Sequence, residues 1–321
     1  MSSALIIGVT GQDGRLLADL LQSHGTIVWG ASRKGTLPPE LASVLPVPAI
    51  DLRDQGSLVE ALTRARPDEI YHLAAQTSVE RSHTEPVATA ETTGVGVARV
   101  LEAARQVAPR ARIFIPSSSE IFGVPAESPQ HESTPIRPTS PYGAAKVFAQ
   151  HLARIYRRRH DMFVAVGILY NHESPRRPSH FVTRKISLAV AAIARGEASS
   201  LPLGNLDASR DWTYAGDVVR AMRLMLQHHE PADFVIASGQ SRSVRDWCEI
   251  AFRRVGLDYH DYVESDPALW RPAEEPPLVG DATKARTLLG WQPTVSFPEL
   301  VHLMVDADLA RGSHHVDGDR A

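Results

Sequence analysis

The sequence predicts an α/β protein with a doubly wound parallel sheet and a smaller α/β domain in the C-terminal part of the chain. Short apolar runs alternate with helix-like segments over the first 170 residues, and a glycine-rich turn follows the first run. After about residue 170 the chain becomes richer in proline and polar residues. Strands that alternate with helices are typical of parallel βαβ units, whose helices cover both faces of the sheet.

The predicted strands are short, apolar and β-branched or aromatic in composition. The first strand ends at a glycine, as a buried strand before a tight turn would. The predicted strands are residues 4–7, 26–30, 69–73, 112–116, 162–169 and 234–238.

Helices are predicted where apolar residues recur on one face. In residues 15–23 these are Leu16, Leu17, Leu20 and Leu21, and Gly25 follows the helix as a C-terminal glycine. A second helix is predicted at residues 58–65. The proline-rich segment 37–48 is expected to be a loop.

The change in composition predicts the domain boundaries. Residues 1–170 are expected to form the first domain, which residues 212–240 rejoin through the strand at 234–238. Residues 171–211 and 241–308 are expected to form the second domain. The small, polar segment 309–321 is expected to be a disordered tail.

Composition excludes several classes of protein. The 321 residues carry a net charge of −3, which argues against a nucleic-acid partner, and 43% are hydrophobic, which argues against a disordered chain. A single cysteine, Cys248, cannot form a disulfide within the chain, and we predict no metal site. No long apolar run suggests a membrane partner, and the N-terminus lacks a signal-peptide pattern, so we expect a cytoplasmic protein.

The turn after the first strand has the spacing G-x-x-G-x-x-G, with Gly8, Gly11 and Gly14 around Gln12 and Asp13. Glycines allow a tight turn from strand to helix, and the helix N-terminus can then approach a pyrophosphate. No Gly-Lys-Ser/Thr follows, which excludes the Walker phosphate loop. The turn predicts dinucleotide binding on a Rossmann-type sheet.

The residues after the second strand favour NADP over NAD. Arg33 and Lys34 occupy the place where an acidic residue would bind the ribose 2′-hydroxyl of NAD. Arg33 can instead pair with the 2′-phosphate of NADP. The alternative is that both are solvated surface cations.

Tyr142 and Lys146 are four residues apart, which places both side chains on one face of a helix. A lysine charge close to the phenol is expected to lower the tyrosine pKa by roughly 1–3 units and to make it an acid-base catalyst. Ser118 follows a predicted strand, where ligands bind in open α/β sheets. A hydroxyl, a tyrosine and a lysine so arranged indicate hydride transfer with a nicotinamide cofactor.

Glu120 lies two residues beyond Ser118 in the run Ser117–Glu120. These residues could form only a turn or a helix cap. A simple dehydrogenase, however, has no need of a glutamate there, whereas an elimination needs a base beside the redox centre.

These motifs, in this order, resemble the extended short-chain dehydrogenase/reductase superfamily. More specific segments resemble the GDP-mannose 4,6-dehydratase family, and the resemblance runs from the first strand to about residue 308. The segments are GVTGQD (8–13), YHLAAQ (71–76), SPYGAAK (140–146), NHESPRR (171–177), FVTRK (181–185), LGNLDASRDW (203–212) and RPAE (271–274).

The resemblance implies conversion of GDP-D-mannose to GDP-4-keto-6-deoxy-D-mannose. Tyr142 would take the O4 proton while hydride leaves C4 for NADP. Glu120 would then remove the C5 proton and help to expel the C6 hydroxyl as water, and hydride would return to C6. Ser118 would bond O4, and Lys146 would tune Tyr142 and hold the nicotinamide ribose.

The resemblance also implies binding residues. Those for the cofactor are Gly8, Gly11, Gln12, Asp13, Gly14, Arg33, Asp51, Leu52, Leu73, Ala74, Gln76, Tyr142, Lys146, His172 and Arg177. Those for the sugar nucleotide are Asn171, Lys185, Arg210, Arg271 and Glu274, of which the cations suit a diphosphate.

The sequence departs from the family pattern at three places. Ser118 stands where threonine is usual; the hydroxyl is kept. Pro178 replaces a usual glycine, which puts the loop shape and the reach of Arg177 in doubt. The segment from Lys34 to Asp51 is shorter than in longer members, where it contacts a neighbouring subunit. We therefore expect a homodimer or homotetramer, the dimer being the safer prediction.

Three other functions remain open at this stage. A GDP-4-keto-6-deoxymannose reductase would share the cofactor and the Tyr/Lys pair, but it would need no C5 base. A dehydratase of a related GDP-heptose would differ only in pocket shape. A non-catalytic dinucleotide sensor could use the same fold, although it would not need Ser118, Glu120, Tyr142 and Lys146 together.

Overall fold

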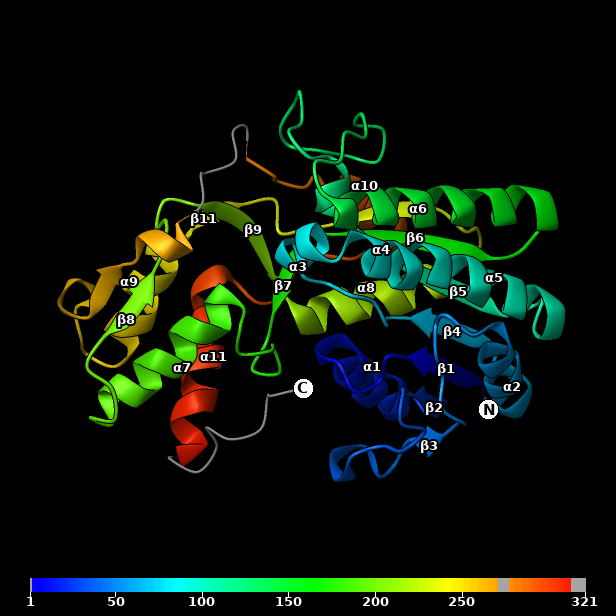
Figure 1. Cartoon of the computed structure of the whole chain (residues 1–321), viewed down its shortest axis with the longest axis horizontal. Coiled ribbons are helices and arrows are strands. Elements are labelled where there is room, and N and C mark those ends of the chain that lie inside the picture. Colours follow the sequence, from blue (N-terminus) through cyan, green and yellow to red (C-terminus); the bar gives the residue numbers. More distant parts are fainter. Residues whose placement is uncertain (1, 271–276, 313–321) are drawn as a thin grey trace.

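The computed structural model describes residues 2–270 and 277–312, which form two lobes (Figure 1). The larger lobe is built on a seven-stranded parallel sheet in the order β10-β6-β5-β4-β1-β2-β3, so the predicted doubly wound fold is confirmed. The strands are β1 (Ser3–Ile7), β2 (Ile27–Ala31), β3 (Leu45–Pro46), β4 (Glu69–His72), β5 (Arg112–Ser118), β6 (Val164–Leu169) and β10 (Asp233–Ile236).

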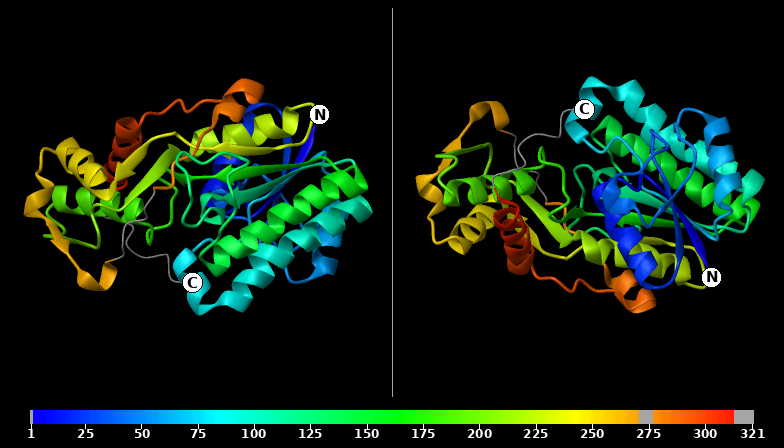
Figure 2. Two further views of the ribbon diagram at one scale, coloured as in Figure 1. Left: turned by 90° about the horizontal axis from the view of Figure 1, so that it is seen from above. Right: turned by 90° about the horizontal axis from the view of Figure 1, so that it is seen from below.

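Helices cover both faces of this sheet because its strands present apolar side chains alternately to each side. In β1, Ala4 and Ile6 belong to one core, and Leu5 and Ile7 to the other. The first core is closed by α1 (Gln12–Ser23), α8 (Ala215–Gln227) and α10 (Thr283–Leu289). The second is closed by α2 (Gln55–Ala65), α5 (Gly96–Val107) and α6 (Pro141–His160), and Figure 2 shows these layers from two sides.

The order in which the chain adds strands to the sheet reverses between β1 and β4. From β1 the chain runs outward to β2 and β3, and β4, β5 and β6 then follow on the other side. In such sheets, ligands bind at the carboxyl ends of the strands beside this switch point. The fold therefore places a binding site beyond Ile7 and His72.

The smaller lobe carries two short sheets and three longer helices, which lie at one end of the molecule in Figure 1. Its core contains Trp212, Trp247 and Cys248, and Phe297 packs against it. The elements are β7 (Asn171–Glu173), α7 (Val182–Ala194), β8 (Leu201–Leu203), β9 (Ser209–Tyr214), β11 (Ser241–Ser243), α9 (Val244–Arg254), β12 (Val263–Ser265) and α11 (Phe297–Ala310).

Several predicted boundaries need correction. The first helix begins at Gln12 rather than at residue 15, since the glycine turn itself enters the helix. The segment 37–48 includes a 3-10 turn and the edge strand β3 as well as loop. Helices were not predicted in residues 79–107, where the structure has α3 (Val79–Thr84), α4 (Pro86–Thr89), a π-helical turn (Ala90–Val95) and α5.

The chain after residue 241 returns to the large lobe before it ends in the small one, which the composition did not indicate. Residues 241–308 were assigned to the second domain, but Ala282, Ala285 and Trp291 are buried in the core of the large sheet. The Trp291 indole donates a hydrogen bond to the carbonyl of Asp217 at 2.8 Å, which explains this return. Helix α11 then packs in the small lobe and continues to Ala310, two residues into the expected tail.

Asp211 of β9 joins three segments with one fully buried carboxylate. It accepts hydrogen bonds from the backbone N–H groups of Ser238 (2.8 Å), Gly239 (2.9 Å) and Gly280 (3.2 Å), and from the Ser238 hydroxyl (2.6 Å). Buried N–H groups without an acceptor are costly. The carboxylate thus holds β9 against the chain that follows β10.

We predict that Asp211→Ala lowers the free energy of unfolding by roughly 3–5 kcal/mol, because it leaves several buried donors unpaired. Urea titration measures the change. The matched control is Asp207→Ala, whose carboxylate forms an exposed pair with Arg245 and should cost under about 1 kcal/mol. Equal losses in the two variants would contradict the role of Asp211.

Candidate active site

The glycine turn brings the N-terminus of α1 onto the carboxyl ends of β1 and β4. Gly8 has φ +92°, and a Cβ there would lie 2.7 Å from the backbone nitrogen of Ala74. A Cβ on Gly14 would lie 2.4 Å from the carbonyl oxygen of Gly8. Gly11 is the N-cap of α1 and has no capping side chain, so the first N–H groups of the helix are available to an anion. The cradle fits a dinucleotide pyrophosphate.

Gln12 and Asp13 tie this turn to β7 of the other lobe. The Gln12 amide donates to the carbonyl of His172 (3.1 Å) and accepts from the Ser174 hydroxyl (2.9 Å). The Asp13 carboxylate lies 2.9 Å from Nε2 of His172. These contacts therefore join the two lobes at the predicted cofactor site.

The contact between Asp13 and His172 shifts both pKa values, lowering that of Asp13 and raising that of His172. Burial alone would raise the pKa of Asp13, but the charge and hydrogen bond of His172 outweigh it and lower the pKa. Burial alone would lower the pKa of His172, and Asp13 outweighs that effect and raises it. Each group thus favours the charged form of the other.

The predicted adenosine-side residues lie at the ends of neighbouring strands. Arg33 follows β2 and is exposed, and Asp51 and Leu52 follow the segment that contains β3. A hydrogen bond from Arg53 holds the pKa of Asp51 at about 2. The exposed Arg33 makes no hydrogen bond or ion pair within the described part of the chain.

Leu73, Ala74 and Gln76 follow β4. The Leu73 N–H donates to the carbonyl of Ile7 at 2.7 Å, and Ala74 contacts Gly8. The Gln76 amide donates to the carbonyl of Ser78 (2.9 Å), which fixes the loop. These three residues line the switch point together with the glycine turn.

Ser118, Glu120 and Tyr142 meet where β5 ends and α6 begins. The Ser118 hydroxyl and the Glu120 charge both act on the Tyr142 phenol, the first lowering and the second raising its pKa. The Ser118 Oγ also accepts from the Glu120 N–H at 3.3 Å. Lys146 lies one turn along α6, with Nζ 5.6 Å from the Tyr142 ring centroid and donating to the Pro116 carbonyl at 2.8 Å.

Helix α6 starts at this place for reasons visible in its first residues. The Ser140 hydroxyl accepts from the Gly143 N–H at 3.0 Å, and Pro141 occupies the first helical position. A Cβ on Gly143 would lie 2.6 Å from the carbonyl oxygen of Glu120. Gly143 was not among the predicted site residues, yet it lets the helix bring Tyr142 up to Glu120.

The prediction that Lys146 lowers the pKa of Tyr142 is wrong for the chain without a bound cofactor. Burial raises the pKa of Tyr142 to about 12, the Ser118 hydrogen bond acts against it, and the Glu120 charge adds to it. Burial also lowers the pKa of the Lys146 amine to about 8, although Asp13 opposes the change. The Lys146 Nζ donates to the Pro116 carbonyl, and Lys146 does not offset the effect of burial on the phenol pKa.

Two further residues at the site were missed by sequence reasoning. Ser174, in the segment NHESPRR, is fully buried and bonds Gln12. His72 ends β4 with only 2% of its surface exposed, and burial, aided by the charge of Lys146, lowers its pKa to about 3. Position at the end of a central strand was the available signal for His72.

Arg177 makes its side-chain contacts within its own segment. Its guanidinium stacks 3.6 Å from the Phe181 ring centroid, and Nε lies 3.2 Å from the Glu173 carboxylate. Its charge acts on the pKa values of Asp13, His172 and Tyr142. A contact of Arg177 with the cofactor stays a prediction.

The predicted sugar-nucleotide residues come from the small lobe. Asn171 pairs with Trp212 in the β7–β9 ladder, and Arg210 lies two residues before Trp212 on β9. Lys185 of α7 donates from Nζ to the Pro202 carbonyl at 2.6 Å. Arg271 and Glu274 lie outside the described residues.

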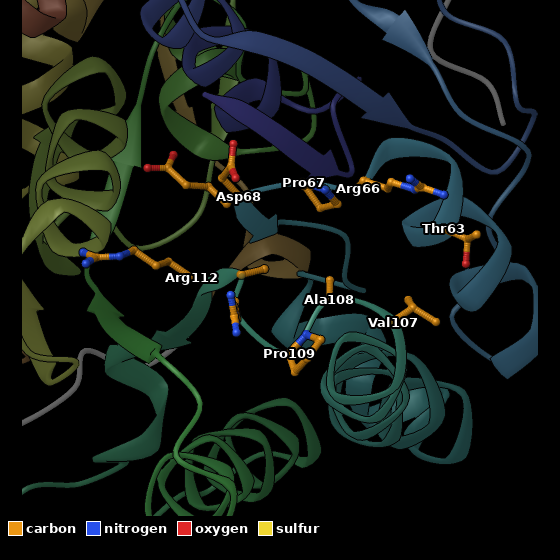
Figure 3. Close-up of a pocket in the computed structure, with 11 residues that line it drawn as sticks. Thr63, Arg66, Pro67, Asp68, Val107, Ala108, Pro109 and Arg112 are labelled. Carbon is orange, nitrogen blue, oxygen red and sulfur yellow. The ribbon is translucent and has the colours of Figure 1, made fainter. Parts of the chain in front are cut away.

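A hollow of about 770 Å³ lies at the opposite edge of the sheet (Figure 3). Its lining includes Asp68, Glu69 and Arg112, where β4 and β5 begin, whereas the residues above follow the strand ends. It is therefore separate from the candidate active site. In residues 2–270 and 277–312, no group of three or more His, Cys, Asp or Glu side chains could hold a metal.

Comparison with solved structures supports the fold and the type of site. RMD from Pseudomonas aeruginosa, solved with NADPH, has a TM-score of 0.84 and 25% identity, with 97% of this chain and all of that chain covered. UDP-glucose 4-epimerase from Thermus thermophilus, solved with NAD, has a TM-score of 0.84 and 28% identity, with 97% and 99% covered.

Sequence comparison is more specific. A GDP-mannose 4,6 dehydratase from Arabidopsis thaliana is 42% identical over 95% of this chain and 86% of its own length. The Homo sapiens protein of that name is 40% identical over 95% and 91%, and that of Sinorhizobium fredii is 41% identical over 96% of both chains. The model of the family described as GDP-mannose 4,6 dehydratase matches residues 5–304. The chain belongs to the GDP-mannose 4,6-dehydratase family.

Proposed function

We propose that this protein is an NADP-dependent GDP-mannose 4,6-dehydratase, a hydro-lyase that forms GDP-4-keto-6-deoxy-D-mannose. The observation that carries the proposal is the meeting of Ser118, Glu120 and Tyr142 at the end of β5, with Lys146 one turn along α6. They lie at the same edge of the sheet as the phosphate-binding turn. Family membership supports the substrate.

NADP fits the residues present. The cradle of Gly8 and Gly14 and the N-terminus of α1 suit the pyrophosphate, and exposed Arg33 suits the 2′-phosphate. Tyr142 and Lys146 would lie on the nicotinamide side. When bound, NADP accepts a hydride from C4 of the sugar and returns it to C6.

The chain's own residues move the protons. In the complex with NADP and the sugar nucleotide, Tyr142 acts as the phenolate and takes the O4 proton as C4 becomes a ketone, and the Ser118 hydroxyl donates to the sugar oxygen. The ketone acidifies the C5 hydrogen; Glu120 removes that proton and transfers it to the C6 hydroxyl, which leaves as water. Tyr142 then returns its proton to C5. The sugar loses one water, and the cofactor is unchanged after each cycle.

Glu120 favours the dehydratase over the reductase that shares this cofactor. A C4 reductase needs the hydroxyl, tyrosine and lysine but no base for C5. Glu120 lies close enough to Tyr142 for its charge to raise the phenol pKa. One pair of groups can therefore serve O4 and C5 of the same sugar ring.

We also propose that the protein is a homodimer or homotetramer in the cytoplasm. Apolar side chains are exposed along α6 and on the helix before the π-helical turn: Phe148 is 47% exposed, Ile155 46% and Val87 76%. Such a surface suits a second copy of the chain. No helix in the described segments is both long and apolar enough to span a bilayer.

We predict that the purified protein converts GDP-mannose to a 4-keto-6-deoxy product without added reductant. The product is lighter by one water, about 18 mass units, and no net NADPH is consumed, because the hydride is returned. Mass spectrometry and NMR of the product, with nicotinamide absorbance followed in parallel, measure this. Dependence on stoichiometric NADPH would point to the reductase, and nucleotide binding without turnover to the sensor.

Glu120→Gln should lower turnover by roughly 10²–10⁴-fold, because it removes the C5 base and keeps the size of the side chain. The first oxidation should survive, so reduced nicotinamide should accumulate when GDP-mannose is added. Tyr142→Phe is the matched control and should give neither reduced nicotinamide nor product. Unchanged turnover in Glu120→Gln would remove Glu120 from the mechanism.

Arg33→Ala should weaken NADP binding by about 10–100-fold and leave NAD binding nearly unchanged, since only NADP carries the 2′-phosphate. Titration with both nucleotides measures the ratio. Lys34→Ala tests whether any cation in this turn has the same effect. Equal losses for NADP and NAD would show that Arg33 is a surface cation only.

A further inference from the structure

His172 is held between two hydrogen-bond acceptors. Its Nδ1 lies 2.8 Å from the carbonyl oxygen of Tyr170, and its Nε2 lies 2.9 Å from Oδ2 of Asp13. The side chains of His172 and Asp13 are only 14% and 20% exposed. A neutral imidazole carries one N–H, so one of its nitrogens would face an acceptor with a lone pair. With Asp13 ionised, the geometry suits the doubly protonated imidazolium, which donates to both acceptors.

Asp13 needs this partner because of where it lies. It occupies the first turn of α1, at the helix N-terminus that the proposed function assigns to the NADP diphosphate. An uncompensated carboxylate there would repel the diphosphate. The other nearby cations have other partners: Arg177 is paired with Glu173, and the Lys146 Nζ donates to the Pro116 carbonyl.

We propose that the His172 imidazolium cancels the charge of Asp13 at the diphosphate-binding end of α1, and that loss of its proton weakens the retention of NADP. The proposal rests on the proposed function for the identity of the nucleotide. It makes His172, which comes from the small lobe, a positioning residue for the cofactor turn of the large lobe.

The direction of the pH effect follows from the partners. Asp13 raises the pKa of His172, and Arg177 and burial oppose it without cancelling it. The stabilising charge pair is complete at and below the ordinary histidine pKa of about 6.5 and is lost as pH rises through the raised value. Lys146 and Tyr142 also interact with Asp13, and the pKa of Lys146 is about 8. A pH profile alone therefore cannot separate His172 from Lys146.

The test combines two substitutions with NMR of the histidine ring. His172→Gln can still donate to Asp13 but carries no charge, so NADP should dissociate roughly tenfold faster or more. In Asp13→Asn/His172→Gln no carboxylate remains, and release should return to within about threefold of the unsubstituted protein. At pH 6.5, the ordinary histidine pKa, more than half of the His172 rings should carry protons on both nitrogens in the unsubstituted protein.

Three outcomes would overturn the proposal. The double variant could release NADP as fast as His172→Gln, which would make His172 only a contact of the cofactor. The NMR spectrum at pH 6.5 could show a neutral ring. His172→Gln could retain NADP normally. None of these measurements uses GDP-mannose, so failure of the dehydratase assignment would be seen separately, in the assay of turnover; thermal unfolding of each variant checks that it folds.

Discussion

The close approach of two helix N-termini to the carboxyl edge of one parallel sheet is the constraint on which the site depends. Gly14 lets α1 lie against the backbone of Gly8, and Gly143 lets α6 lie against the carbonyl of Glu120. A side chain at either glycine would push a helix away from the strand ends. The first contact shapes the phosphate cradle, and the second sets Tyr142 beside Glu120. Cofactor and acid-base groups consequently share one edge of the sheet.

Burial then determines the charges of the groups that meet there. It raises the pKa of Tyr142 to about 12 and lowers that of Lys146 to about 8. The phenol of the chain alone therefore favours its protonated form; the Ser118 hydroxyl opposes this effect of burial, and the Glu120 charge adds to it. At the turn, in contrast, Asp13 and His172 are close partners, and each favours the charged form of the other.

Much of the fold could be predicted because its signals are local. The apolar run before Gly8, the face of leucines in α1 and the spacing of Tyr142 and Lys146 each lie within a few neighbouring residues. Residues 79–95 gave no such signal: β-branched and glycine residues in the run Thr92–Gly96 disfavour an ordinary helix, and the structure has a π-helical turn there. In α5, by contrast, Val97, Val100, Leu101 and Ala104 do recur on one buried face, and that signal was missed. The return of Trp291 to the large core depends on a distant carbonyl, that of Asp217.

The residues of the candidate site also fall into those with a local sequence signal and those that depend on distant contacts. Residues within one motif could be placed from spacing, but the pair of Asp13 and His172 joins positions far apart in the chain. Burial is also a property of the whole fold, which is why the expected lowering of the Tyr142 pKa was wrong in direction. The role of Gly143 follows from a contact with Glu120 that no spacing rule indicates.

The central claim is that these residues carry out an internal redox elimination on a single sugar. GDP-mannose labelled with deuterium at C4 tests it most directly, with the product analysed by NMR and mass spectrometry. The account predicts that the label moves to C6 of the same molecule while C5 takes its hydrogen through Tyr142 and exchanges with solvent. A product without label at C6, or label that passes to a second, unlabelled sugar nucleotide in the mixture, would contradict it.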